Sequence, residues 1–185
     1  METLNGATIA CRLLERQGVR IVFGIPGGAI LPFYDALSQS SLRHVLARHE
    51  QGAGFMAQGL ARATGEVGVA IATSGPGIAN LLTAIADAKA DSVPLVCISG
   101  QVPQSLLGTD AFQEIAALDL ARPITKAAWM ARSPEDLLRM VPDAFRLALS
   151  GRPGPVLIDL PKDVQLARCM VERWPDQGRA DAPPR

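Results

Sequence analysis

The chain has 185 residues, 48% of them hydrophobic and 19% charged, a composition typical of one soluble globular domain with a sizeable core. The formal net charge is zero and aromatic residues make up 4%, so the sequence indicates neither a nucleic acid nor a membrane as partner. No apolar run is long enough to span a membrane and no export signal is visible, so we expect a cytoplasmic location.

Helical and strand-like patterns alternate along the chain. Helices are predicted at residues 8–17, 29–37, 50–64, about 77–89 and 134–149. Apolar runs predict strands at residues 20–24, 43–47, 67–73, 94–99, 124–130 and 155–160. Polar and apolar residues do not alternate in these runs, which indicates strands covered on both faces. We therefore expect an α/β fold with three layers, in which a mainly parallel six-stranded sheet has helices on both faces.

Two further features of the sequence bear on its organisation. From residue 172 onward the chain is polar and proline-rich, which indicates a linker or tail after a domain of residues 1–171. Three cysteines, Cys11, Cys97 and Cys169, are widely spaced and form no CxxC pair. We interpret Cys11 and Cys97 as small buried hydrophobes in a reducing compartment.

One acidic residue, Glu50, follows the strand pattern at 43–47 and opens the helix pattern at 50–64. Open parallel sheets bind ligands at the edge where their strands end, so this carboxyl is a candidate functional group. The alternative is an ordinary first-turn glutamate, which the helix dipole favours. His49 and His44 are interpreted as structural, and because neither lies in a ligand-spaced cluster we expect no protein-only metal site.

Three loops also follow predicted strands, as Glu50 does. The loop at 24–28 is glycine-rich but lacks the GxGxxG spacing of a dinucleotide fingerprint, and no GxxxxGK[ST] occurs. Gly75-Pro76-Gly77 precedes a helix whose free N–H groups can hold a polar ligand, with Asn80 one turn in. Ser74 lacks the GxSxG context of a nucleophile. The third loop spans residues 108–113, and for the two glycine loops a tight strand-to-helix turn remains the alternative.

The combination of five segments resembles the thiamine-diphosphate-dependent enzymes, and within them the large catalytic subunits of acetolactate (acetohydroxyacid) synthases. The segments are FGIPGGAILPFYDAL (23–37), RHEQGAGFMAQGLARATG (48–65), ATSGPGIANLLTAIADA (72–88), GTDAFQE (108–114) and SGRPGPVLIDLPKDVQ (150–165). The resemblance extends to about residue 172, and the GTDAFQE loop and the PGGAI turn favour acetolactate synthases. It implies that residues 1–171 are a thiamine-diphosphate pyrimidine-binding domain and residues 172–185 a linker or tail.

The resemblance also implies roles for individual residues. The Glu50 carboxyl would hydrogen-bond the aminopyrimidine ring of thiamine diphosphate and so activate the cofactor. Gln113 is the second implied catalytic residue, and Phe112 and Lys126 match residues of the substrate channel. The implied cofactor-binding residues are Pro26, Gly27, Gly28, Ala29, Glu50, Gly75 and Asn80. The related glyoxylate carboligases carry an apolar residue at the position of Glu50, which argues against that activity.

The activity implied by the resemblance is decarboxylation of pyruvate and its condensation with a second 2-keto acid, in branched-chain amino acid biosynthesis. Mg²⁺ and FAD are expected only through domains absent from this sequence, so the chain alone is expected to be inactive. We expect a homodimer or larger assembly, with scope for a regulatory subunit. Two alternatives stay open: a stand-alone non-catalytic module that pairs with and modulates full-length enzymes, and a nucleotide-binding α/β domain.

Overall fold

A six-stranded parallel sheet forms the centre of the chain, in a computed structural model that describes residues 1–177. The strand order is β3-β2-β4-β5-β7-β6, and every neighbouring pair is parallel. The strands are β2 (Ile21–Gly24), β3 (Arg43–Leu46), β4 (Gly68–Ala72), β5 (Leu95–Gln101), β6 (Ala127–Met130) and β7 (Pro155–Pro161). The predicted six-stranded α/β sheet is therefore confirmed.

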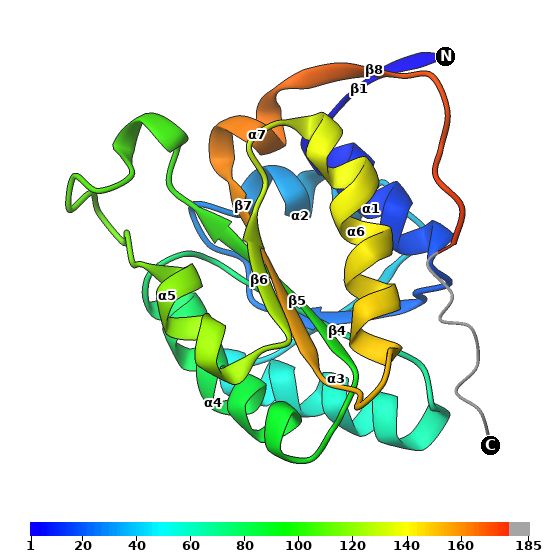
Figure 1. The fold of residues 1–185 in the computed structure, drawn as a ribbon. Coiled ribbons are helices and arrows are strands. Elements are labelled where there is room, and N and C mark those ends of the chain that lie inside the picture. Colours follow the sequence, from blue (N-terminus) through cyan, green and yellow to red (C-terminus); the bar gives the residue numbers. More distant parts are fainter. Residues whose placement is uncertain (178–185) are drawn as a thin grey trace.

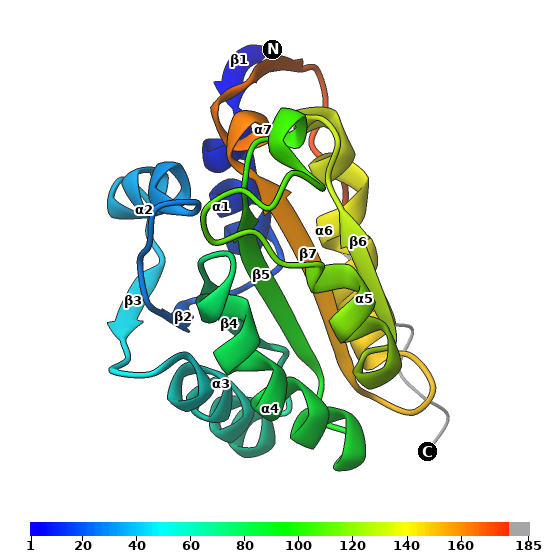
Figure 2. The ribbon, with the colours of Figure 1, turned by 90° about the vertical axis from the view of Figure 1, so that its left-hand side faces the viewer.

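Helices cover both faces of this sheet (Figures 1 and 2). They are α1 (Gly6–Arg16), α2 (Leu31–Ser38), α3 (Glu50–Thr64), α4 (Pro76–Ala90), α5 (Ala117–Ala121), α6 (Pro134–Leu149) and α7 (Lys162–Leu166). One core cluster joins α1, α2 and α6 to one face, and a second joins α3, α4 and α5 to the other. Every residue of β4, β5 and β7 is buried, which explains why these strands are apolar without alternation.

Local signals fix the ends of the longest helices. At the start of α3 the His49 side chain accepts a hydrogen bond from the backbone N–H of Gln51, and at its end Gly65 takes the left-handed conformation with φ of 75°. A capping box of Ser133 and Asp136 opens α6, which continues through Pro142 to Leu149. Both helices have the predicted bounds. No helix among residues 1–177 combines the length and the apolar character needed to cross a membrane.

The structure adds elements that the sequence patterns did not predict. A separate antiparallel sheet pairs β1 (Glu2–Asn5) with β8 (Arg168–Val171), at the top of Figure 1. The short helices α5 and α7 were also missed, because five residues are too few to show a helical period. Of the predicted linker or tail, residues 172–177 form no helix or strand, and residues 178–185 lie outside the described part.

Several predicted boundaries shift by one to three residues, and at two of them a turn precedes the element. The helix predicted from residue 29 begins at Leu31, since the N–H of Ile30 bonds the carbonyl of Gly27 in a turn. The strand predicted from residue 124 begins at Ala127, because a short 3₁₀ helix (Arg122–Ile124) comes first. All three cysteines are free and buried, and burial raises the pKa of the Cys11 thiol to about 12.

Packing of α3 against α4 depends on Gly54. A Cβ built on Gly54 would lie 2.4 Å from the Cβ of Ala84, so Gly54→Ala is expected to lower the free energy of unfolding by about 1–3 kcal/mol. At Gly59, on the same helix, an added Cβ has open space. Gly59→Ala should therefore raise the free energy of unfolding by about 0.5–1 kcal/mol. Urea unfolding of both variants checks this, and equal effects of the two methyl groups would contradict it.

Candidate functional site

All six parallel strands end at one edge of the sheet, and the strand order reverses direction there. The chain passes from β2 outward to β3 and then returns to β4 on the other side of β2. Such a reversal leaves a crevice at the carboxyl ends of the strands, which is where open α/β sheets bind ligands. The loops after β2 and β4 flank this crevice, and they carry most of the residues predicted to bind a cofactor.

The two loops are in direct contact through Thr73, the buried residue that follows β4. Its side-chain oxygen Oγ1 accepts a hydrogen bond of 3.3 Å from the backbone N–H of Ala29. A Cβ built on Gly27 would lie 2.6 Å from the Cβ of Thr73, and one on Gly77 would lie 2.7 Å from its Cγ2. Positions 27 and 77 therefore require glycine, because the backbone there lies too close to Thr73 for any side chain. Gly28, by contrast, faces open space.

Glu50 lies at the same edge, as the first residue of α3. Its carboxylate is half-buried, and its Oε2 accepts a 2.9 Å hydrogen bond from Nδ2 of Asn80 on α4. Burial, followed by the nearby Glu50 carboxylate, raises the pKa of the Tyr34 hydroxyl, which places a phenol of α2 close to the same carboxylate. The structure thus brings together Glu50 and Asn80, two of the predicted site residues, and adds Tyr34, which sequence reasoning missed.

His44 and His49 have structural contacts in this region. The His44 ring packs edge-on against Tyr34, with ring centroids 5.0 Å apart, and lies 3.3 Å from the carbonyl oxygen of Gly24. Burial lowers the pKa of His44. His49 caps α3 from an exposed position. These contacts agree with the structural interpretation of both histidines.

The third predicted loop, between β5 and α5, reaches back to the loop after β4. It extends away from the body of the molecule on the left of Figure 1. Gly75 has φ of 57°, and a Cβ there would lie 2.7 Å from the carbonyl oxygen of Gln113. Gln113 itself has φ of 59°, a left-handed conformation that is uncommon outside glycine. Strained backbone is found preferentially at functional sites, and here it fixes the contact between two site loops.

A surface hollow of about 280 Å³ forms where these loops meet. It is lined by Gly28, Ala29, Ser74, Val102, Pro103, Leu106, Ala111, Phe112, Gln113 and Lys162. Four of the predicted site residues are among them: Gly28, Ala29, Phe112 and Gln113. The Phe112 side chain is 87% exposed, so the hollow has an apolar ring at its rim with no cover from the described residues.

Lys126 is not brought to this hollow, which corrects its prediction as a channel residue. It directly precedes β6 and so lies at the opposite, amino-terminal edge of the sheet, where its Nζ donates to the carbonyl oxygens of Leu147 and Ser150. The lysine that lines the hollow is Lys162, which follows β7. Its position directly after a strand is the signal that could have identified it from the sequence.

Glu114 organises the loop that carries Phe112 and Gln113. Its carboxylate accepts hydrogen bonds from the backbone N–H groups of Gly108, Thr109 and Ala111. These bonds, led by that from Gly108, hold the pKa of Glu114 below its usual value. The GTDAFQE segment is therefore an ordered turn around one of its own side chains.

Gln165 is a fully buried amide that sequence reasoning missed. From α7 its Nε2 donates to the carbonyl oxygens of Ala29 (2.7 Å) and Leu160 (2.8 Å), and its Oε1 accepts from the N–H of Phe33 (3.2 Å). These bonds fix the loop after β2 and the start of α2 to the chain that follows β7. No local pattern marks such a residue, because two of its three partners, Ala29 and Phe33, lie more than 130 positions away.

Comparison with known protein families agrees with this geometry. Residues 4–120 match the family described as "Thiamine pyrophosphate enzyme, N-terminal TPP binding domain". The chain is 58% identical over 181 residues to the acetolactate synthase isozyme 1 large subunit of Escherichia coli, covering 97% of this chain and 32% of that protein. It is 53% identical over 180 residues to a probable acetolactate synthase large subunit of Methanocaldococcus jannaschii, covering 97% and 30%. The chain thus spans about a third of the length of these relatives.

Replacing Gln165 tests whether its amide holds the loop after β2. Gln165→Leu leaves three buried backbone groups without their partner, so we expect the free energy of unfolding to fall by about 3 kcal/mol or more. The neighbouring Leu166 is 55% exposed, and Leu166→Ala should change it by no more than about 0.5 kcal/mol. Denaturant unfolding measures both, and a neutral effect of Gln165→Leu would rule out the role assigned to this amide.

Proposed function

Because the chain belongs to the thiamine pyrophosphate enzyme family, as its N-terminal TPP-binding domain, we propose that it binds the aminopyrimidine side of thiamine diphosphate in an acetolactate synthase. The observation that carries this proposal is the Glu50 carboxylate, which Asn80 orients at the head of α3 beside the crevice. When bound, the cofactor supplies the electron sink for decarboxylating a 2-keto acid. The Glu50 carboxyl would share a proton with the ring nitrogen of the aminopyrimidine and so favour the activated form of the cofactor.

The residues around Glu50 fit a flat, partly polar ligand. Gly28 leaves the backbone of the loop after β2 uncovered on one side of the crevice, and Pro26, Gly27 and Ala29 adjoin it. Gly75 and Asn80 border the other side, at the start of α4. We assign cofactor binding to these residues together with Glu50, since the exposed Gly28 and the short side chains around it admit a ring close to the carboxylate.

The hollow beside the crevice suits the reacting substrates. Gln113 supplies an amide, Lys162 a cation and Phe112 an apolar surface, a combination suited to a small 2-keto acid with one carboxylate. We assign Gln113 to catalysis, Phe112 to the substrate channel, and Lys162 to binding of the substrate carboxylate. Lys126 is left out of this assignment because it lies at the other edge of the sheet.

Because the chain spans about a third of its relatives, the complete activity is part of the proposal. In it, pyruvate is decarboxylated and condensed with a second 2-keto acid, in branched-chain amino acid biosynthesis. Mg²⁺, FAD and the cofactor's diphosphate are held by further domains of the longer protein, and a regulatory subunit is compatible with the relatives' designation as large subunits. No observation favours a non-catalytic module or a nucleotide-binding domain.

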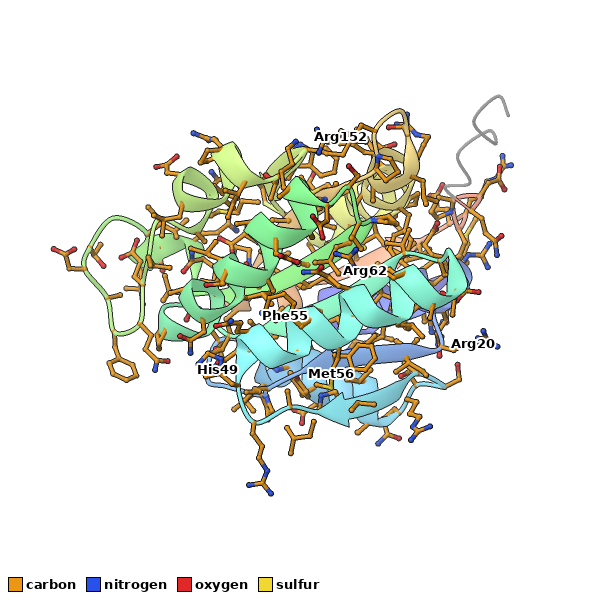
Figure 3. The ribbon with its side chains drawn as sticks, turned by 90° about the horizontal axis from the view of Figure 1, so that it is seen from below. Arg20, His49, Phe55, Met56, Arg62 and Arg152 are labelled. Carbon is orange, nitrogen blue, oxygen red and sulfur yellow. The ribbon has the colours of Figure 1, made fainter. Side chains whose placement is uncertain are left out.

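We assign self-association to the outer side of α3. Phe55 is 40% and Met56 36% exposed on this helix, and Leu46, at the end of the strand that precedes it in the chain, is 64% exposed. Figure 3 shows α3 across the face nearest the viewer, with His49 at its beginning and Phe55 and Met56 along it. Adjoining exposed apolar side chains favour association, so a dimer is the expected minimal assembly.

Glu50→Gln tests the proposed catalytic role. The amide retains an oxygen that accepts the Asn80 hydrogen bond, so thiamine diphosphate should still bind, while acetolactate formation by the full-length protein should fall by roughly 10²–10⁴-fold. The exchange of the thiazolium proton, followed by NMR, should slow in parallel. Glu66→Gln, at an exposed surface position, serves as the control. Full activity of the Glu50→Gln enzyme would disprove the assignment.

Met56→Lys tests the proposed association surface. Placing a charge in the apolar side of α3 should raise the dimer dissociation constant by on the order of tenfold or more, as measured by sedimentation equilibrium. Met170→Lys introduces the same charge on β8, where the methionine is 57% exposed, and should leave the constant unchanged. If both substitutions act alike, α3 is not the interface.

A further inference from the structure

A buried polar network joins the two central strands β5 and β7 at their carboxyl ends. Asp159 on β7 and Ser99 on β5 are fully buried, and Gln101 on β5 is 1% exposed. The Ser99 hydroxyl donates to Oδ1 of Asp159 at 2.6 Å, and Nε2 of Gln101 donates to Oδ2 at 3.0 Å. The carboxylate therefore has a donor on each oxygen, which a buried charge requires.

The Gln101 amide also bonds both ends of the loop that carries Phe112 and Gln113. Its Oε1 accepts from the backbone N–H of Val102 at 2.9 Å, and its Nε2 donates to the carbonyl oxygen of Ile115 at 3.2 Å. Val102 begins this loop and Ile115 ends it, so one amide group closes the base of the whole segment. The loop is otherwise exposed, and a fixed base determines where its tip lies.

Asp159 determines which way the amide of Gln101 faces. An ionised carboxylate only accepts hydrogen bonds, so it selects the Gln101 orientation in which Nε2 points toward it. In that orientation Oε1 faces the N–H of Val102 and the second hydrogen of Nε2 faces the carbonyl of Ile115. The reverse orientation would set two donors against each other at Val102 and leave the carboxylate facing an oxygen.

We propose that Asp159 and Gln101 are positioning residues of the active site, which hold the loop at 102–115 so that Gln113 and Phe112 face the hollow beside Gly28 and Ala29. This inference rests on the proposed function for its effect on turnover, and on the hydrogen bonds alone for its effect on the loop. Neither residue lines the hollow at Lys162, so both act through the loop.

The network is sensitive to pH. Burial raises the pKa of Asp159 to about 6, against the hydrogen bonds from Ser99 and Gln101. The titratable and charged groups nearest to the network line a hollow beside Gln101: Glu114, which bonds its own loop, and the ion-paired Asp119 and Arg122. As pH falls through about 6 the carboxylate gains a proton and becomes a weaker acceptor for Gln101, so the base of the loop loosens.

The raised pKa of Asp159 also affects the free energy of unfolding. Lowering the pH loosens the base of the loop but increases the stability of the folded protein. Because the pKa of Asp159 is raised in the folded protein, its contribution to stability is complete below the unfolded value of 3.8 and is lost as pH rises through about 6. The carboxylate is therefore retained at neutral pH at a cost to stability. Asn at position 159 can accept from Gln101 through its oxygen and donate to Ser99 through its nitrogen, so Asp159→Asn removes the charge and keeps the bonds.

Hydrogen–deuterium exchange of the full-length protein tests the proposal directly. Gln101→Met removes all three hydrogen bonds of the amide, to Asp159, Val102 and Ile115. The backbone N–H groups of residues 104–115 should then exchange at least roughly tenfold faster relative to their intrinsic rates. The wild-type loop should lose protection between pH 8 and pH 5, whereas Asp159→Asn should show the weaker protection at every pH in that range. Peptides covering β4 should be unaffected in both variants, which shows that the fold is intact.

Two results would overturn the proposal: unchanged loop exchange in Gln101→Met, or the wild-type pH dependence persisting in Asp159→Asn. Turnover provides the second readout. Loop displacement in Gln101→Met should lower kcat/KM for the keto acid by on the order of tenfold to a hundredfold, with the affinity for thiamine diphosphate unchanged. If wild-type protein binds no thiamine diphosphate, the proposed function fails while the exchange result still decides the positioning role.

Discussion

Two backbone segments, the loop after β2 and the start of α4, converge on the side chain of Thr73, and the site depends on how closely they approach it. Gly27 and Gly77 pack against its methyl and methine carbons, and Ala29 donates to its hydroxyl. A β-branched residue of fixed rotamer is a suitable centre for such a contact because it cannot move aside. The loop after β2 and the start of α4 are therefore set at one separation, which in turn sets the width of the crevice beside Glu50.

The polar interior of this domain belongs to its site as much as to its core. Asp159, Gln101 and Gln165 lie among apolar side chains, where an amide or carboxyl costs free energy unless every polar atom is bonded. Gln101 and Gln165 bond directly to loops at the carboxyl edge of the sheet, and Asp159 reaches one of these loops through Gln101. Stability is thus given up at buried positions to order loops that have few apolar contacts of their own.

The sequence was sufficient wherever the determining signal was local. Gly65 ends α3 and Ser133 begins α6, and both helices have the predicted bounds. The hydrogen bonds of Gln165 and Asp159 could not be predicted in this way, because they depend on which strands lie side by side. The pairing of β5 with β7 skips β6, and no periodic pattern reports that order.

Lys126 and Lys162 show a second limit to predicting the site from the sequence. Both lysines adjoin strands of one parallel sheet, but Lys126 precedes β6 whereas Lys162 follows β7. Residues before and after parallel strands lie at opposite edges, so strand direction alone separates the two. A sequence motif specifies residue types and their spacing. The path of the chain through the sheet determines at which edge each residue lies.

The small sheet of β1 and β8 has a consequence for how the domain forms. Residues 2–5 pair with residues 168–171, so the first strand has no partner until nearly the whole domain has been synthesised. Meanwhile α1 packs on α6 and its neighbours, whose contacts also span most of the chain. Contacts of such long sequence separation slow folding. During translation the amino-terminal segment therefore stays unpaired until residues 168–171 have been synthesised, and their pairing completes this small sheet.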